Sequence, residues 1–173
     1  MTGGGIEVTS IVSGIDVDAV LDELTDRLDG SRGVLLSSSY EYPGRYTRWD
    51  MGFVDPPLVL TSTGQQVTVE ALNDRGKVLI GAVADAVRVR EGVTDLVVGA
   101  SRVICGIERP PRRFEEEERS RPPSTFSVVR AIIDLFACED PFLGLYGAFG
   151  YDLAFQFEPI ELTLPRPDDQ RDL

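Results

Sequence analysis

The sequence contains no histidine, only 2 cysteines, and far fewer basic than acidic residues. The absence of histidine removes the commonest general base and the commonest metal ligand. Cys105 and Cys138 lie far apart and form no metal-binding spacing, so we expect free thiols in a reducing cytoplasm. The formal net charge of −12 argues against a nucleic-acid partner.

Long apolar runs are also missing. No stretch approaches the length of a membrane span, so we expect no membrane partner. The first residues have neither the basic region nor the apolar core of a signal peptide. A length of 173 residues with 42% hydrophobic content is compatible with one domain, or a large part of one, with a sizeable core.

The most distinctive stretch is residues 34–50, VLLSSSYEYPGRYTRWD. It begins as a strand, turns at Pro43-Gly44, and continues through residues 45–49 as a second strand rich in β-formers. Its hydroxyls, aromatic rings and two arginines could hold a small polar ligand with an aromatic part. An ordinary surface hairpin is the other interpretation. Residue types alone favour the ordinary hairpin, because convergent polar groups only define a default site.

Hydrophobic periodicity predicts the remaining elements. Helices are expected at 16–29, capped by Asp16 and ended by Gly30, at 78–89 and at 124–137. In the last helix we expect a buried stripe of Phe126, Val129, Ile132, Ile133 and Phe136. Strands are expected at 6–12, 51–54, 58–62 and 65–72, with a loop at 73–76.

Residues 109–123 differ in kind, with four prolines, five arginines and an acidic run at 115–118. The acidic run could be a metal site. A solvated flexible loop explains it better, because hard-metal sites need carboxylates that a fold holds in place. Residues 142–157 then repeat glycine among aromatics, a pattern that marks bulges or close backbone approach in a strand.

Two of these motifs resemble a known family. Residues 40–50 (YEYPGRYTRWD), followed by 55–58 (DPPL), are similar to the N-terminal region of anthranilate synthase component I, closest to bacterial forms fused to their glutamine amidotransferase. Residues 144–152 (GLYGAFGYD) resemble that family's glycine-rich strand, which ends in a tyrosine-aspartate pair. The resemblance covers most of the chain, from about the first helix to the end.

The resemblance implies an α+β fold of mainly antiparallel β-sheets packed with helices. It implies conversion of chorismate and glutamine-derived ammonia into anthranilate and pyruvate, the first step of tryptophan synthesis, under feedback inhibition by tryptophan. In that family the chorismate-binding C-terminal half holds the catalytic residues and Mg²⁺. We therefore expect residues 1–173 to be an incomplete N-terminal region, inactive alone, whose partners are that half and a glutamine amidotransferase.

The resemblance also places part of the tryptophan inhibitor site in this chain. The family's leucine-leucine-glutamate-serine motif falls on residues 35–38 (LLSS). Ser38 occupies the position of the motif serine, whereas Ser37 stands where the family has glutamate. The substitution at Ser37 removes a carboxylate that could pair with the ligand's ammonium group. The following basic residue falls on Arg48, and Leu36 and Tyr40 are candidates to flank the indole.

Two other functions stay open. An aminodeoxyisochorismate synthase of secondary metabolism would share the fold without tryptophan feedback, although the arginine-tyrosine stretch favours anthranilate synthase. A stand-alone amino-acid-binding module is the third interpretation. The polar end of the chain argues against it, because in the family another strand follows there.

Overall fold

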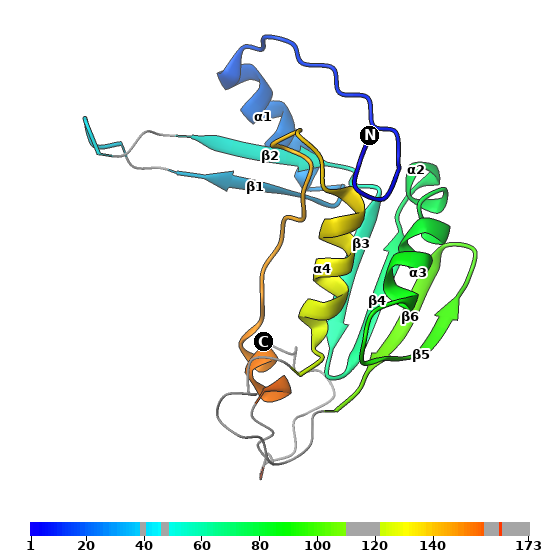
Figure 1. The fold of residues 1–173 in the computed structure, drawn as a ribbon. Helices are drawn as coiled ribbons and strands as arrows, with labels where there is room; N and C mark the ends of the chain where they lie inside the picture. The colour runs from blue at the N-terminus through cyan, green and yellow to red at the C-terminus, as the bar shows by residue number, and fades with distance from the viewer. Residues whose placement is uncertain (39–40, 46–48, 110–121, 158–162, 164–173) are drawn as a thin grey trace.

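The computed structural model describes residues 1–38, 41–45, 49–109, 122–157 and 163 (Figure 1). The helices and strands of the described residues are, in chain order, α1 (Val17–Leu28), β1 (Gly33–Ser37), β2 (Asp50–Val54), β3 (Leu58–Thr63), β4 (Gln66–Ala71), α2 (Asp74–Lys77), α3 (Ile80–Arg88), β5 (Val93–Val98), β6 (Arg102–Ile107), α4 (Thr125–Phe136) and the 3₁₀ helix η2 (Tyr151–Gln156). The expected α+β class with antiparallel sheets is confirmed.

The body of the protein is a four-stranded antiparallel sheet in the order β3-β4-β6-β5. Helices α3 and α4 lie side by side across one face of this sheet (Figure 1). Successive side chains of a strand point to opposite faces of the sheet, so every second side chain points toward the helices. Val67 pairs with Cys105 and Val69 with Val103 in the register of β4 and β6, and all four are buried.

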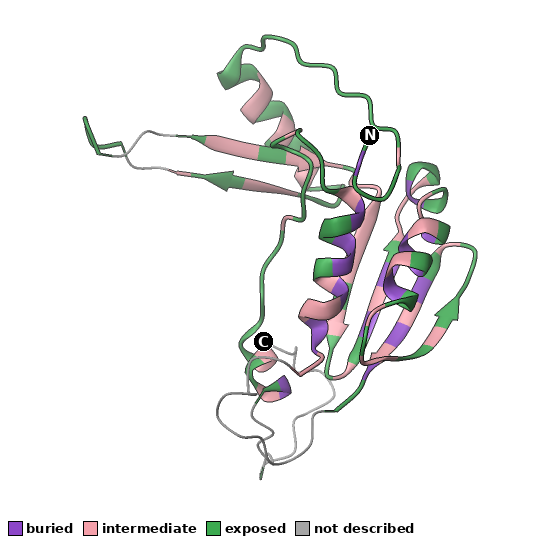
Figure 2. Cartoon of the chain, in the orientation of Figure 1, coloured by how far each residue is buried: buried purple, intermediate pink, exposed green. Residues whose placement is uncertain are grey.

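One hydrophobic core fills the space between the sheet and the two helices (Figure 2). Its members are Val67, Val69, Ile80, Val83, Ala84, Val87, Val103, Cys105, Ile107, Val128, Ala131, Ile132 and Leu135. Both cysteines are free thiols, as expected, and burial raises the pKa of the Cys105 thiol.

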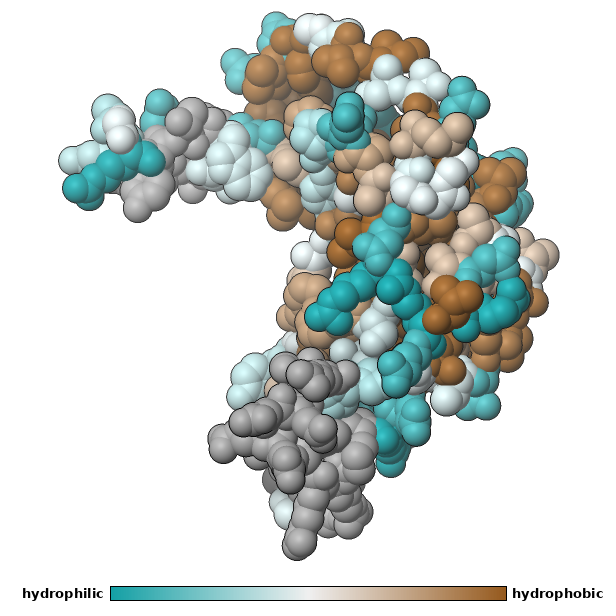
Figure 3. All heavy atoms as spheres, viewed as in Figure 1, coloured by the Kyte–Doolittle hydropathy of each residue, from teal (hydrophilic) through white to brown (hydrophobic). Residues whose placement is uncertain are grey.

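Strands β1 and β2 form a separate two-stranded antiparallel sheet, which we call the ribbon. The ribbon projects from the body (Figures 1 and 3). Helix α1 lies against it, and the Asp16 side chain accepts a hydrogen bond from the Ala19 N–H, which confirms the predicted cap. No residue of α1 or of the ribbon is buried (Figure 2).

Residues 138–157, which we call the strap, run from the end of α4 past the ribbon and return to the start of α4 (Figure 1). The Tyr146 ring contacts Phe53 of the ribbon, with ring centroids 5.4 Å apart. At the other end, Phe126 of α4 packs against Phe149 and Phe157 at centroid distances of 5.2 and 6.1 Å. The strap therefore touches both the ribbon and the body.

Three expectations about the N-terminal half were wrong. Residues 6–12 form no strand, and their alternating apolar side chains gain little burial, since Ile11 is 91% exposed and Val12 is 86% exposed. Residues 73–76 are not a loop, because Asn73 caps α2 and residues 74–76 belong to it; the Asn73 side chain accepts a hydrogen bond from the Gly76 N–H at 3.1 Å. The expected strand at 45–49 is wrong at Arg45, which lies in the turn, while residues 46–48 lie outside the described residues and β2 covers Asp50–Val54.

The C-terminal half departs from expectation in two ways. The predicted stripe of α4 is confirmed at Ile132 and in part at Phe136, which is partly buried against the core, and it is wrong at Ile133, which is 49% exposed. The fully buried residues of the helix are Thr125, Val128, Ala131, Ile132 and Leu135. Smaller side chains face the sheet, while Phe126 faces the strap. The glycine-rich residues 142–150 form no strand. The expected loop at 109–123 lies mostly outside the described residues.

Candidate functional site

The hairpin geometry sets the candidate site. Ser37 pairs with Asp50 and Leu36 with Met51 in the antiparallel register of the ribbon. The pairing continues one step beyond the strands, because the Ser38 N–H donates to the Trp49 carbonyl at 2.9 Å. The predicted turn at Pro43-Gly44 is present, and Gly44 adopts a φ of +77°, a conformation that favours glycine.

The ribbon separates the predicted site residues onto two faces. Successive side chains of a strand point to opposite faces, and cross-strand partners share a face. Leu36 and Ser38 therefore lie on one face with Met51 and Trp49, and we call this the site face. Ser37 lies on the other face, where its hydroxyl donates to the carboxylate of Asp50.

Helix α1 covers the face that holds Ser37. A Cβ atom added to Gly33 would come within 2.7 Å of Leu28 Cδ2, and one added to Gly52 would meet Leu24 Cδ2. The two glycines thus allow α1 to lie directly on the backbone of the ribbon. Because α1 occupies that face, the site face is the face of the described ribbon that α1 leaves accessible.

The site face combines apolar and polar groups in a fixed order along the ribbon. Phe53 and its partner Val34 lie nearest the body, and Leu36 and Met51 follow. Of these three pairs, Ser38 and Trp49 lie farthest from the body. Leu36 is 40% exposed and Trp49 is 52% exposed. An aromatic ring could lie on the apolar part while the polar groups of an amino acid reach the Ser38 hydroxyl.

Two of the predicted site residues, Tyr40 and Arg48, lie outside the described residues. Of the predicted set, the structure brings Leu36 and Ser38 together and directs Ser37 away from them. Met51 and Phe53 also lie on the site face and were not among the predicted site residues. Alternation alone could have identified them, because the register follows from the turn.

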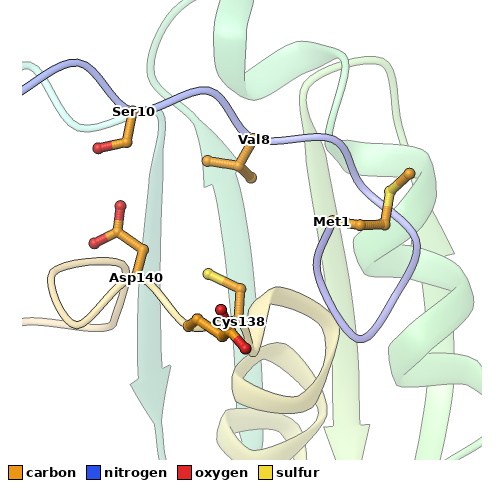
Figure 4. Close-up of a pocket in the computed structure, with 6 residues that line it drawn as sticks. Met1, Val8, Ser10, Cys138 and Asp140 are labelled. Carbon is orange, nitrogen blue, oxygen red and sulfur yellow. The ribbon is translucent and has the colours of Figure 1, made fainter.

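A separate pocket of about 400 Å³ lies between the N-terminal segment and the residues after α4 (Figure 4). Ser10 and Asp140 lie on one side of it, one from each segment, and Val8 and Cys138 also line it. None of the predicted site residues lines this pocket. It offers no aromatic wall, so it does not match the chemistry that the ribbon presents.

Within the described residues, no three histidine, cysteine or acidic side chains gather as a metal site would require. The acidic run at 115–118 lies outside the described residues. In the part of the chain that the structure describes, no helix is long and apolar enough to cross a membrane.

Comparisons with known proteins found two similar sequences. The chain is 53% identical, over 173 residues and 99% of its length, to a curated protein of Azospirillum brasilense named anthranilate synthase. This chain is homologous to anthranilate synthase. A weaker match, 27% identical over 139 residues and 76% of the chain, is anthranilate synthase component 1 of Vibrio cholerae.

The chain spans about a quarter of the length of these relatives, 24% and 25% respectively. No family model matches the chain, and no solved structure matches it. The similarity to the Azospirillum protein, which runs along 99% of this chain, agrees with the resemblance that the hairpin and glycine-rich motifs indicate.

Proposed function

We propose that this chain is the N-terminal regulatory and structural portion of an anthranilate synthase and carries part of its tryptophan feedback site. The observation that carries the proposal is the 53% identity over 99% of the chain to a curated anthranilate synthase. The complete enzyme would convert chorismate and ammonia into anthranilate and pyruvate, with a glutamine amidotransferase as partner and a cytoplasmic location.

The catalytic residues and Mg²⁺ belong, in this proposal, to a chorismate-binding half outside these residues. Among the described residues of the site face no acid–base constellation forms, because their side chains are aliphatic, thioether, aromatic or hydroxyl groups. The chain's contribution is therefore regulation and support of the fold. A stand-alone binding module would account less well for identity that runs along the whole chain to part of a longer enzyme.

The feedback site in this proposal uses the site face of the ribbon. Leu36 supports the indole of tryptophan, and Ser38 pairs with a polar group of the ligand. Ser37 acts indirectly, because its hydroxyl holds the Asp50 carboxylate on the opposite face. Tyr40 and Arg48 remain predictions as further contacts with the ligand.

A fluorescence assay for anthranilate tests the proposal. With chorismate, Mg²⁺ and excess ammonium, residues 1–173 alone should give no turnover above a blank, because the proposed catalytic half is missing. The complete polypeptide that contains this chain should form anthranilate, and tryptophan should inhibit it. Turnover by residues 1–173 alone would contradict the proposal. A different amino product from the complete polypeptide would favour an aminodeoxyisochorismate synthase.

A further inference from the structure

An aromatic side chain from a distant part of the sequence closes the inner end of the site face. The ring of Tyr146 lies 5.4 Å from the ring of Phe53, and the two planes are tilted by 59°. Tilted aromatic pairs at this separation are favourable. Between residues 141 and 150, only Tyr146 is partly buried, and the others are exposed.

Local contacts hold Tyr146 in place. Its hydroxyl donates to the Phe142 carbonyl at 2.7 Å, and the Phe142 N–H donates to the Asp140 side chain at 2.9 Å. The ring also lies close to Gly144, where an added Cβ would be 3.8 Å from it. The hydrogen bond from the hydroxyl leaves the ring as the part of Tyr146 that faces the ribbon.

The far end of the strap is fixed to the body by Gln156, which is 8% exposed. Its Nε2 donates to the Gly64 carbonyl at 2.7 Å and to the Thr125 hydroxyl at 2.6 Å. Its Oε1 accepts from the Thr125 N–H at 3.0 Å. The strap is therefore held by the body, and Tyr146 reaches the ribbon from a fixed support.

The spacing of a strand relates Tyr146 to the ligand position. Alternate residues of a strand lie about 6.6 Å apart. Phe53 is one such step from Met51, which pairs with Leu36, and Ser38 is one step from Leu36 in the opposite direction. An aromatic ring placed over Leu36 and Met51 would thus meet Phe53 and Tyr146 at its inner edge and leave its polar groups near Ser38.

We propose that Tyr146 is a specificity-determining residue of the amino-acid site, and that its ring forms the inner wall against the indole of tryptophan. This inference rests on the proposed function, because it names a further wall of the same feedback site. A ligand held by both Tyr146 and Leu36 bridges the strap and the ribbon. Tryptophan therefore stabilises one position of the ribbon relative to the body.

The test is the dissociation constant of L-tryptophan and of L-phenylalanine, measured by calorimetry on the complete polypeptide. Tyr146→Ala should raise the dissociation constant of tryptophan about three- to tenfold, because an aromatic contact is lost. Tyr146→Phe keeps the ring, so its dissociation constant for tryptophan should stay within about twofold of the unmodified value. Tyr151→Ala is the matched control, since Tyr151 lies on the same strap and is 81% exposed.

The ratio of the two dissociation constants separates a ligand contact from general loosening of the strap. The indole reaches further toward Tyr146 than a phenyl ring does, so Tyr146→Ala should reduce the preference for tryptophan. An equal loss for both ligands, or no loss, would overturn the inference while the feedback site stands. If the unmodified polypeptide does not bind tryptophan, the feedback part of the proposed function fails, and this inference fails with it.

Discussion

The body and the ribbon are stabilised in different ways. In the body, two helices and a four-stranded sheet enclose a continuous core in which several side chains are 0–2% exposed. The ribbon and α1 contain no buried residue. A two-stranded sheet is only marginally stable by itself in water. The candidate site therefore lies in the part of the described chain that has the fewest buried contacts. In such a region, binding of a partner or ligand is expected to shift the structure most.

The largest effect is expected in the body. Ile132→Ala should lower the free energy of unfolding by about 2–5 kcal/mol, because the side chain is 2% exposed and its removal leaves a cavity. Ile133→Ala, one residue further along α4, should cost less than about 1 kcal/mol since Ile133 is 49% exposed. Urea unfolding measures both values. Equal losses would show that the body has a different core face.

The next effect concerns the ribbon. Ser38→Phe in the complete polypeptide removes a hydroxyl, at about 0.5–1.5 kcal/mol, and crowds the site face, at about 1–3 kcal/mol. Tryptophan affinity should fall by roughly one to three powers of ten. The turnover rate without tryptophan should change much less, because coupling between the sites is needed only for inhibition.

The measurement for Ser38→Phe is the tryptophan concentration that gives half inhibition. Ser37→Ala is the control, because this hydroxyl points to the face that α1 covers and should alter inhibition far less. Unchanged inhibition in a well-folded Ser38→Phe protein would refute the placement of the site. It would also favour the function without tryptophan feedback.

The smallest effect is expected where the strap joins the body. Gln156→Leu leaves the Thr125 N–H and the Gly64 carbonyl without their partner, at about 1–3 kcal/mol. We expect faster limited proteolysis within the strap, whereas the control Tyr151→Leu should be cleaved at the original rate. Faster cleavage in the control as well, or no change in either variant, would contradict the role of Gln156.

The sequence predicts the elements whose signals are local. The Asp16 cap identifies α1, and the alternation around Val67 and Val69 identifies β4. Strand β5 was not predicted, because its pattern is broken by an irregular register between Thr94 and Val97 with Asp95 at a φ of 49°. Strand β6 was not predicted either, although the alternation of Val103, Cys105 and Ile107 indicates a strand.

The site was only partly predictable for the same reason. The resemblance selects residues 35–38, and alternation then decides that Leu36 and Ser38 share a face while Ser37 does not. The contact of Phe53 with Tyr146 joins two segments far apart in the sequence, and no local sequence pattern predicts it. The α4 stripe was misjudged because both sides of that helix are apolar and one of them faces the strap.

The first residues of the chain complete the last turn of α4. The Gly3 N–H donates to the Ala137 carbonyl at 2.7 Å, and the Gly4 N–H donates to the Leu135 carbonyl at 3.0 Å. Nearly the whole described chain separates these partners, and contacts of such long sequence separation slow folding. During synthesis the two glycines emerge before the four strands of the body, and their carbonyl partners emerge after those strands. The helix end that leads into the strap can therefore be completed only after all four strands of the body have been made.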